Sequence, residues 1–109
     1  MKLLLDEQLP TTLRHELDEA HEVFSAEFMR WKGKKNGELL GLMLWHGFEG
    51  LITNDKNLIY QQNLSKMSIK FFVLNSPTNN LPDLIPRMKK LNEILKNPPE
   101  NQVIEVSLD

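Results

Sequence analysis

A run of three leucines at residues 3–5, ended at once by Asp6 and Glu7 and then by Pro10, constrains the fold more than any other feature. Three residues are too few for a core helix, and a short apolar run bounded by breaking residues is typical of a strand buried on both faces. Such strands occur in parallel sheets that carry helices on both sides. Open α/β sheets bind their ligands at the carboxyl ends of the strands. We therefore expect Asp6 and Glu7 to lie at the functional edge of the sheet.

Four further short apolar segments follow, and they alternate with segments of helical or turn character. The additional strands are expected at residues 22–26, 48–55, 69–74 and 102–106, the last as an edge strand. Helices are expected at residues 10–19, 36–47 and 84–95, with a short helix or turn at 56–65. This alternation predicts right-handed crossovers and a three-layer α/β/α sandwich around a mainly parallel five-stranded sheet.

Size and composition limit the class of protein. A chain of 109 residues suits a single domain over residues 1–109. Fifteen acidic and thirteen basic residues give a formal charge of -2, which does not draw the whole chain to nucleic acid but allows a local basic patch. The absence of cysteine excludes disulfides and thiolate sites. No apolar run approaches a membrane span, and the first residues lack the pattern of a signal peptide, so we expect a cytoplasmic protein.

Carboxylates are expected at the functional edge from three separate segments. Asp6 ends the first strand, Asp55 ends the third, and Glu38 lies in the first turn of the helix between the second and third strands. Oxygen ligands of this kind, without His or Cys among them, suit Mg²⁺ or Mn²⁺. Such ions, held by carboxylates and by substrate phosphate oxygens, activate water for phosphodiester cleavage. The sequence therefore predicts a catalytic metal site formed by Asp6, Glu38 and Asp55.

A simpler interpretation of these acidic residues stays open at this stage. A single aspartate after a strand is more often a turn or cap residue than a metal ligand. Like charges that cluster repel one another unless a cation or a proton offsets them. This cost favours a functional role for the three carboxylates taken together. Glu7 points to the other face if the strand continues, and we expect it to be a neighbour or cap of the site.

Positive charge gathers in the segment before Glu38. Residues 28–36 show no periodicity and are expected to form a loop. Its cations are Arg30, Lys32, Lys34 and Lys35. The loop could overhang the acidic edge and hold an RNA backbone, with Trp31 stacking on a base, or it could be a solvated loop with Trp31 packed on the core. Lys56 could neutralise phosphate or pair with a carboxylate such as the adjacent Asp55.

Three segments of the chain, in order and spacing, resemble the small prokaryotic PIN-like proteins of the DUF5615 family. These segments are residues 4–10 (LLDEQLP), residues 31–40 (WKGKKNGELL) and residues 51–57 (LITNDKN). The family is similar to the nuclease half of the Mut7-C type and to toxin ribonucleases of type II toxin–antitoxin pairs. The resemblance implies a PIN-like sheet of order 3-2-1-4-5, a divalent-metal site, cleavage of RNA and an antitoxin partner. A homodimer is a further candidate assembly.

Carried over by position, the resemblance assigns the acidic site to Asp6, Glu38 and Asp55. The chain differs from many PIN domains at Asn57, where those domains carry a further aspartate nearby. This amide leaves open whether a second metal ion binds and how active the enzyme is.

Two other classes of function fit parts of the same pattern. One is a PIN-like module that binds RNA or protein without catalysis. The amide at Asn57, in place of an aspartate, favours this alternative. The other is a phosphorylation receiver domain, which also has an acidic pair after the first strand and an aspartate after the third. Receivers need a hydroxyl after the fourth strand, which Ser76 could supply, and a lysine after the fifth, which is missing here. We rank both below the metal-dependent ribonuclease.

Overall fold

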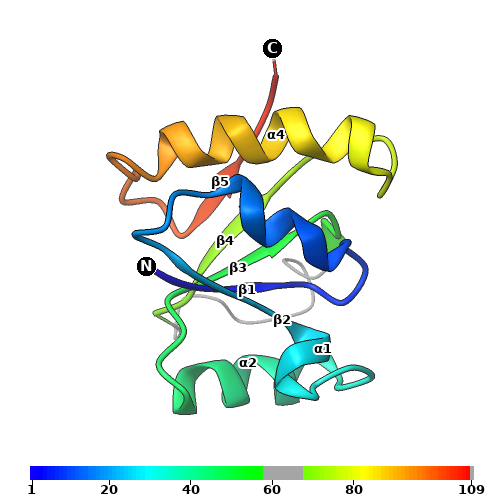
Figure 1. The fold of residues 1–109 in the computed structure, drawn as a ribbon. Helices are drawn as coiled ribbons and strands as arrows, with labels where there is room; N and C mark the ends of the chain where they lie inside the picture. Colours follow the sequence, from blue (N-terminus) through cyan, green and yellow to red (C-terminus); the bar gives the residue numbers. More distant parts are fainter. Residues whose placement is uncertain (58–67, 109) are drawn as a thin grey trace.

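The computed structural model describes residues 1–57 and 68–108, which form a parallel sheet with helices on both faces (Figure 1). The strands are β1 (Lys2–Leu5), β2 (Glu22–Ser25), β3 (Gly50–Thr53), β4 (Lys70–Val73) and β5 (Val103–Glu105). The helices are η1 (Thr11–Glu16, a 3₁₀ helix), α1 (Ala26–Met29), α2 (Asn36–Trp45) and α4 (Leu81–Ile94). The predicted α/β class, the parallel sheet and the edge position of the last strand are confirmed.

The predicted strand order 3-2-1-4-5 is wrong, because the strands lie in the order β2-β1-β3-β4-β5. Leu4 of β1 lies between Phe24 of β2 and Leu51 of β3. Burial explains the arrangement: all four residues of β3 are buried, whereas β2 begins with the exposed Glu22. A strand that is apolar on both faces suits the interior of a sheet, and a partly polar strand suits an edge.

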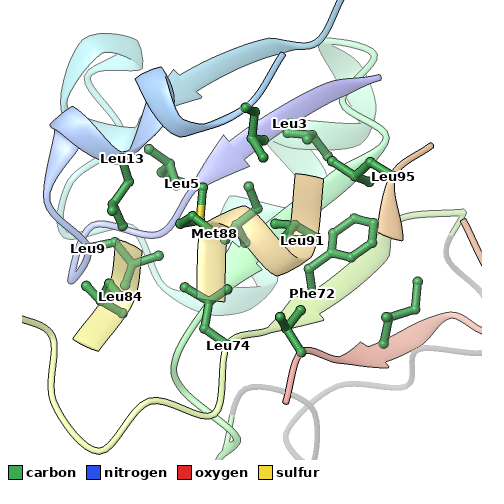
Figure 2. Packing of buried hydrophobic residues seen from close by; sticks show 14 residues of the cluster. Leu3, Leu5, Leu9, Leu13, Phe72, Leu74, Leu84, Met88, Leu91 and Leu95 are labelled. Carbon is green, nitrogen blue, oxygen red and sulfur yellow. The ribbon is translucent and has the colours of Figure 1, made fainter. Parts of the chain in front are cut away.

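Two clusters of buried side chains hold the helices against the two faces of the sheet. Side chains alternate along a strand, so Leu3 and Leu5 point to one face and Leu4 to the other. The first face is covered by α4 and η1, whose Met88 and Leu13 lie in the same cluster as Leu3 and Leu5 (Figure 2). The second face is covered by α1 and α2 (Figure 1).

The helix predicted at residues 10–19 is the shorter 3₁₀ helix η1. The three leucines spaced four residues apart in this segment are nevertheless all buried in one cluster, as one apolar helix face would be: Leu9, Leu13 and Leu17. The loop predicted at residues 28–36 overlaps α1, in which Ser25 Oγ accepts a hydrogen bond from the amide of Phe28 at 3.0 Å. A helix of four residues is too short for the sequence to show a period, so its side-chain cap is the clearer signal.

The last helix begins earlier than residue 84. In the structure α4 starts at Leu81, with Asn80 as its N-cap. Pro86 therefore lies inside the helix and not in its first turn. The short helix or turn predicted at residues 56–65 falls mostly outside the described residues. Within the described ranges, no helix is both long and apolar enough to cross a membrane.

Gly50 at the start of β3 allows the two strands beside it to pack closely. A Cβ at this position would lie 2.8 Å from Leu3 Cδ2 and 2.8 Å from Phe72 Cε2, both on fully buried side chains. We expect Gly50→Ala to lower the free energy of unfolding by about 1–3 kcal/mol, as overpacking does.

Urea unfolding measures this effect, and Gly41→Ala is the matched control. Gly41 is an exposed residue within α2, and no atom lies within 4 Å of a Cβ built there. This second substitution should raise the free energy of unfolding by about 0.5–1 kcal/mol, because alanine favours the helix. Equal effects of the two substitutions would contradict the packing shown around Gly50.

Candidate functional site

The carboxyl ends of β1 and β3 lie next to each other at a topological switch point. From β1 the chain passes outward to β2, and from β3 it continues in the opposite direction through β4 to β5. Doubly wound sheets of this order bind ligands in the crevice that opens at such a point. The residues that follow the two strands are therefore the first candidates for a functional site.

Asp6 and Asp55 are linked through the hydroxyl of Thr53, the last residue of β3. Thr53 Oγ1 donates a hydrogen bond to Asp6 Oδ2 at 2.8 Å and accepts one from the backbone amide of Asp55 at 3.0 Å. Asp55 Oδ1 in turn accepts from the amide of Asn57 at 2.9 Å. Thr53 is fully buried and Asp55 is exposed, so the linked set runs from the sheet interior to the surface.

The pKa of Asp6 is raised above its ordinary value, mainly because burial penalises the charged carboxylate. The hydrogen bond from Thr53 and the backbone of Glu7 act in the opposite direction. The negative charges of Asp55 and Glu7 raise the pKa further. Asp6 is thus a partly buried acid whose ionised form is disfavoured by its surroundings, a feature that is frequent at functional sites.

Glu38 does not join the Asp6–Asp55 pair in this structure. It lies in the first turn of α2 and forms an ion pair with Lys34, with Nζ and Oε1 2.9 Å apart. Across residues 1–57 and 68–108, no three His, Asp or Glu side chains are grouped closely enough to hold a metal ion. Of the three predicted residues, the structure therefore links two, through the Asp6 carboxylate and the Asp55 backbone amide, and the charge of Asp55 acts on Asp6.

Glu7 lies outside the pair and makes a structural contact. Its Oε2 accepts a hydrogen bond from the amide of Gly33 at 3.1 Å. This contact ties the loop after β1 to the basic loop between α1 and α2. It fits the expectation that Glu7 is a neighbour of the site.

The basic residues of this loop have different surroundings. Lys34 is paired with Glu38, whereas Arg30 and Lys35 are exposed at the ends of α1 and α2. Lys56 is exposed beside Asp55. Trp31 is buried, with its ring centroid 5.6 Å from that of Phe48, so it packs on the core and is not presented to a base.

A cavity of about 340 Å³ opens beside Asp6, between the end of β1, the start of η1 and the start of α1. Its polar lining comes from Asp6, Glu7, Thr11, Thr12, Ser25, Glu27 and Lys32. The volume is at the lower end of the range for small-molecule sites. Asp6 thus faces a space that can admit a ligand group.

The structure adds Asn54 and Thr53 to this edge, two residues that the sequence analysis did not single out. Asn54 Nδ2 donates to the carbonyl oxygen of Ser76 at 3.0 Å, and the amide of Ser76 donates to Asn54 Oδ1 at 2.8 Å. This two-way contact joins the loops after β3 and β4 and supports the segment that carries Asp55. The signal for Thr53 was its place as a polar residue at the end of the apolar run 51–52, but the sequence does not show which side chain it reaches.

Asp6→Asn should make the protein more stable at neutral pH. Because the pKa of Asp6 is higher in the folded than in the unfolded state, its contribution favours folding at acid pH and is lost as the pH rises through the folded pKa. The amide removes the unfavourable charge and can still accept from Thr53. We expect the free energy of unfolding at pH 7 to rise by about 1 kcal/mol, with a smaller difference at acid pH.

Chemical unfolding at several pH values checks this prediction. Glu100→Gln, at an exposed position, is the control and should change the free energy of unfolding by less than about 0.5 kcal/mol. A loss of stability at pH 7 in Asp6→Asn would show that the ionised carboxylate is favoured by its surroundings.

Compared with protein-family models, with curated proteins and with solved structures, the chain shows no match.

Proposed function

We propose that this chain is a metal-dependent ribonuclease with an acidic site like that of PIN-like proteins, on a sheet whose strand order differs from their order 3-2-1-4-5. The observation that carries the proposal is the pairing of Asp6 and Asp55 around one buried hydroxyl at the switch point of the sheet. Both acidic residues follow strands whose carboxyl ends share one edge, and a cavity opens beside Asp6. The resemblance of the chain to PIN-like proteins supplies the reaction class, and its toxin role with an antitoxin partner rests on that resemblance alone.

The residues at this edge fit Mg²⁺ or Mn²⁺. Mg²⁺ is commonly held by one or two carboxylates, with waters and substrate phosphates in its other positions. Asp6 and Asp55 can fill that role without a third carboxylate. When bound, such an ion would supply Lewis acidity toward a phosphate and a more acidic water. The negative charges that raise the pKa of Asp6 are those that a cation would offset.

The cations around the edge would bind and orient the RNA backbone. Lys32 lines the cavity beside Asp6, and Lys56 follows Asp55 directly. Arg30 and Lys35 are exposed farther along the α1–α2 segment and would contact more distant phosphates. We assign Glu38 an accessory role, because Lys34 already neutralises its carboxylate.

A receiver domain is the second candidate, and the strand order favours it. Receivers of the CheY type share the order 2-1-3-4-5 found here. Ser76 stands after β4, but its Oγ donates to the carbonyl of Thr78 at 2.6 Å. Residues 106–109, which follow β5, include no lysine. The nuclease therefore remains the better supported of the two proposals.

Incubation of the purified protein with end-labelled single-stranded RNA tests the proposal. We expect cleavage with Mn²⁺ or Mg²⁺ and none with EDTA. Matched incubations with single-stranded DNA examine whether the substrate class is correct. Intact mass after treatment with acetyl phosphate separates the alternatives, because a labile phosphate on Asp55 without RNA cleavage would favour the receiver. RNA binding without cleavage, in the presence of either Mn²⁺ or Mg²⁺, would favour the non-catalytic module.

A further inference from the structure

Thr53 lies between the two acidic residues, and we propose that it is a positioning residue that sets Asp6 and Asp55 in one arrangement before a ligand arrives. This inference rests on the proposed function and assigns a role to a residue that does not itself touch the substrate. The three residues form a clamp, by which we mean Asp6, Thr53 and Asp55 joined by the two hydrogen bonds of the Thr53 hydroxyl.

The hydroxyl has its hydrogen-bonding capacity directed at the two acidic residues. A hydroxyl carries one hydrogen, and here that hydrogen points to Asp6 Oδ2 at 2.8 Å. A lone pair of the same oxygen accepts the amide of Asp55 at 3.0 Å. Displacement of either acidic residue would break one of the two hydrogen bonds of this buried hydroxyl. The positions of the two residues are therefore coupled through one atom.

The backbone around the clamp is fixed on both sides. The amide of Asp6 donates to the carbonyl of Ile52 at 3.0 Å, which extends the pairing of β1 with β3 up to the acidic residue. The amide of Leu74 donates to the carbonyl of Thr53 at 2.9 Å, which ties the end of β3 to β4. The backbone that carries Thr53 is thus tied to β1 on one side and to β4 on the other, as a positioning group requires.

Burial argues that the hydroxyl serves more than packing. Thr53 is fully buried at the end of a strand whose other three residues are apolar or glycine. Valine has nearly the same shape and would fill this position without a polar atom to satisfy. A buried hydroxyl is unfavourable unless it is hydrogen-bonded, and here its partners are the Asp6 carboxylate and the Asp55 amide.

Two substitutions at this position separate positioning from packing. Thr53→Val removes the hydroxyl at nearly constant volume, whereas Thr53→Ser keeps the hydroxyl and removes a methyl group. We expect Thr53→Val to weaken Mn²⁺ binding, measured by calorimetry, by roughly 10-fold or more, which is the usual effect of a lost supporting contact. Thr53→Ser should stay within roughly threefold of the wild type, although it is expected to be the less well packed variant.

A metal-free measurement gives a second readout. In EDTA, urea unfolding of Thr53→Val, Asp6→Ala and the double variant forms a thermodynamic cycle. We expect the unfolding equilibrium constants to be non-additive by roughly fivefold, since the two side chains are in direct contact. Additive effects, or Mn²⁺ binding by Thr53→Val that equals binding by Thr53→Ser, would overturn the inference.

The two measurements also separate this inference from the proposed function. Non-additivity in the cycle with no Mn²⁺ binding by the wild type would support the clamp and reject the metal site. Normal Mn²⁺ binding by the wild type and by Thr53→Val would support the metal site and reject the clamp.

Discussion

Asp6→Asn and Asp55→Asn are each expected to reduce Mn²⁺-dependent RNA cleavage by roughly 100-fold or more, which corresponds to about 2.7 kcal/mol of activation free energy. Each substitution replaces a carboxylate by an amide of the same shape at the one edge where the two residues meet. The amide is neutral and is a much weaker ligand for a hard divalent cation. Initial cleavage rates with labelled RNA at saturating Mn²⁺ measure the effect.

Glu38→Gln is the informative comparison for these two variants. Because Glu38 is already paired with Lys34, its loss should reduce cleavage less than the loss of Asp6 or Asp55 does. The remote variant Glu100→Gln should cleave at the wild-type rate. Unfolding curves for every variant test whether the fold is retained. Full activity in both aspartate variants, or a larger loss in Glu38→Gln than in either, would contradict the assignment of the site to Asp6 and Asp55.

Mn²⁺ is also expected to stabilise the folded protein. A ligand that binds only the folded state, at a free concentration 100 times its dissociation constant, raises the free energy of unfolding by about 2.7 kcal/mol. This gain should disappear in Asp6→Asn even though that variant is more stable than the wild type without metal. Thermal unfolding with and without Mn²⁺ measures both effects in one series. Equal stabilisation of the wild type and Asp6→Asn would place the bound ion elsewhere.

The strands were the most predictable part of the fold. Short apolar runs that end in polar residues, such as 3–5 and 51–52, can be buried on both faces only in a sheet covered by helices. The order of the strands was predicted wrongly, because the resemblance supplied another order. The burial difference between β3 and the more polar β2, which begins at Glu22, would have favoured the observed one.

Local helical structure was less predictable for reasons of length and tertiary contact. The leucine spacing in residues 9–17 indicates which side chains are buried but does not separate an α-helix from the 3₁₀ helix η1. In α4 the interior Pro86 is tolerated within a helix that packs on the sheet, and this helix begins three residues before the predicted start at residue 84.

The candidate site was predictable only where topology decides it. Parallel strands end at the same edge, so Asp6 and Asp55 could be expected near one another from their positions after two strands. Glu38 lies on a helix, where its direction depends on a neighbour that the sequence does not fix. Its partner Lys34 is four residues earlier, in the loop before α2, and the sequence does not fix the path of that loop. The bridging role of Thr53 depends on distances between strands and could not be read from the sequence.

The central claim is that Asp6 and Asp55 together hold one divalent cation at the switch point of the sheet. Isothermal titration of the metal-free protein with Mn²⁺, for the wild type, Asp6→Asn and Asp55→Asn, tests it most directly. The account predicts saturable binding by the wild type and affinity lower by roughly 100-fold in each variant, since both residues are ligands. A wild-type protein that shows no saturable binding, or variants that bind as the wild type does, would contradict it.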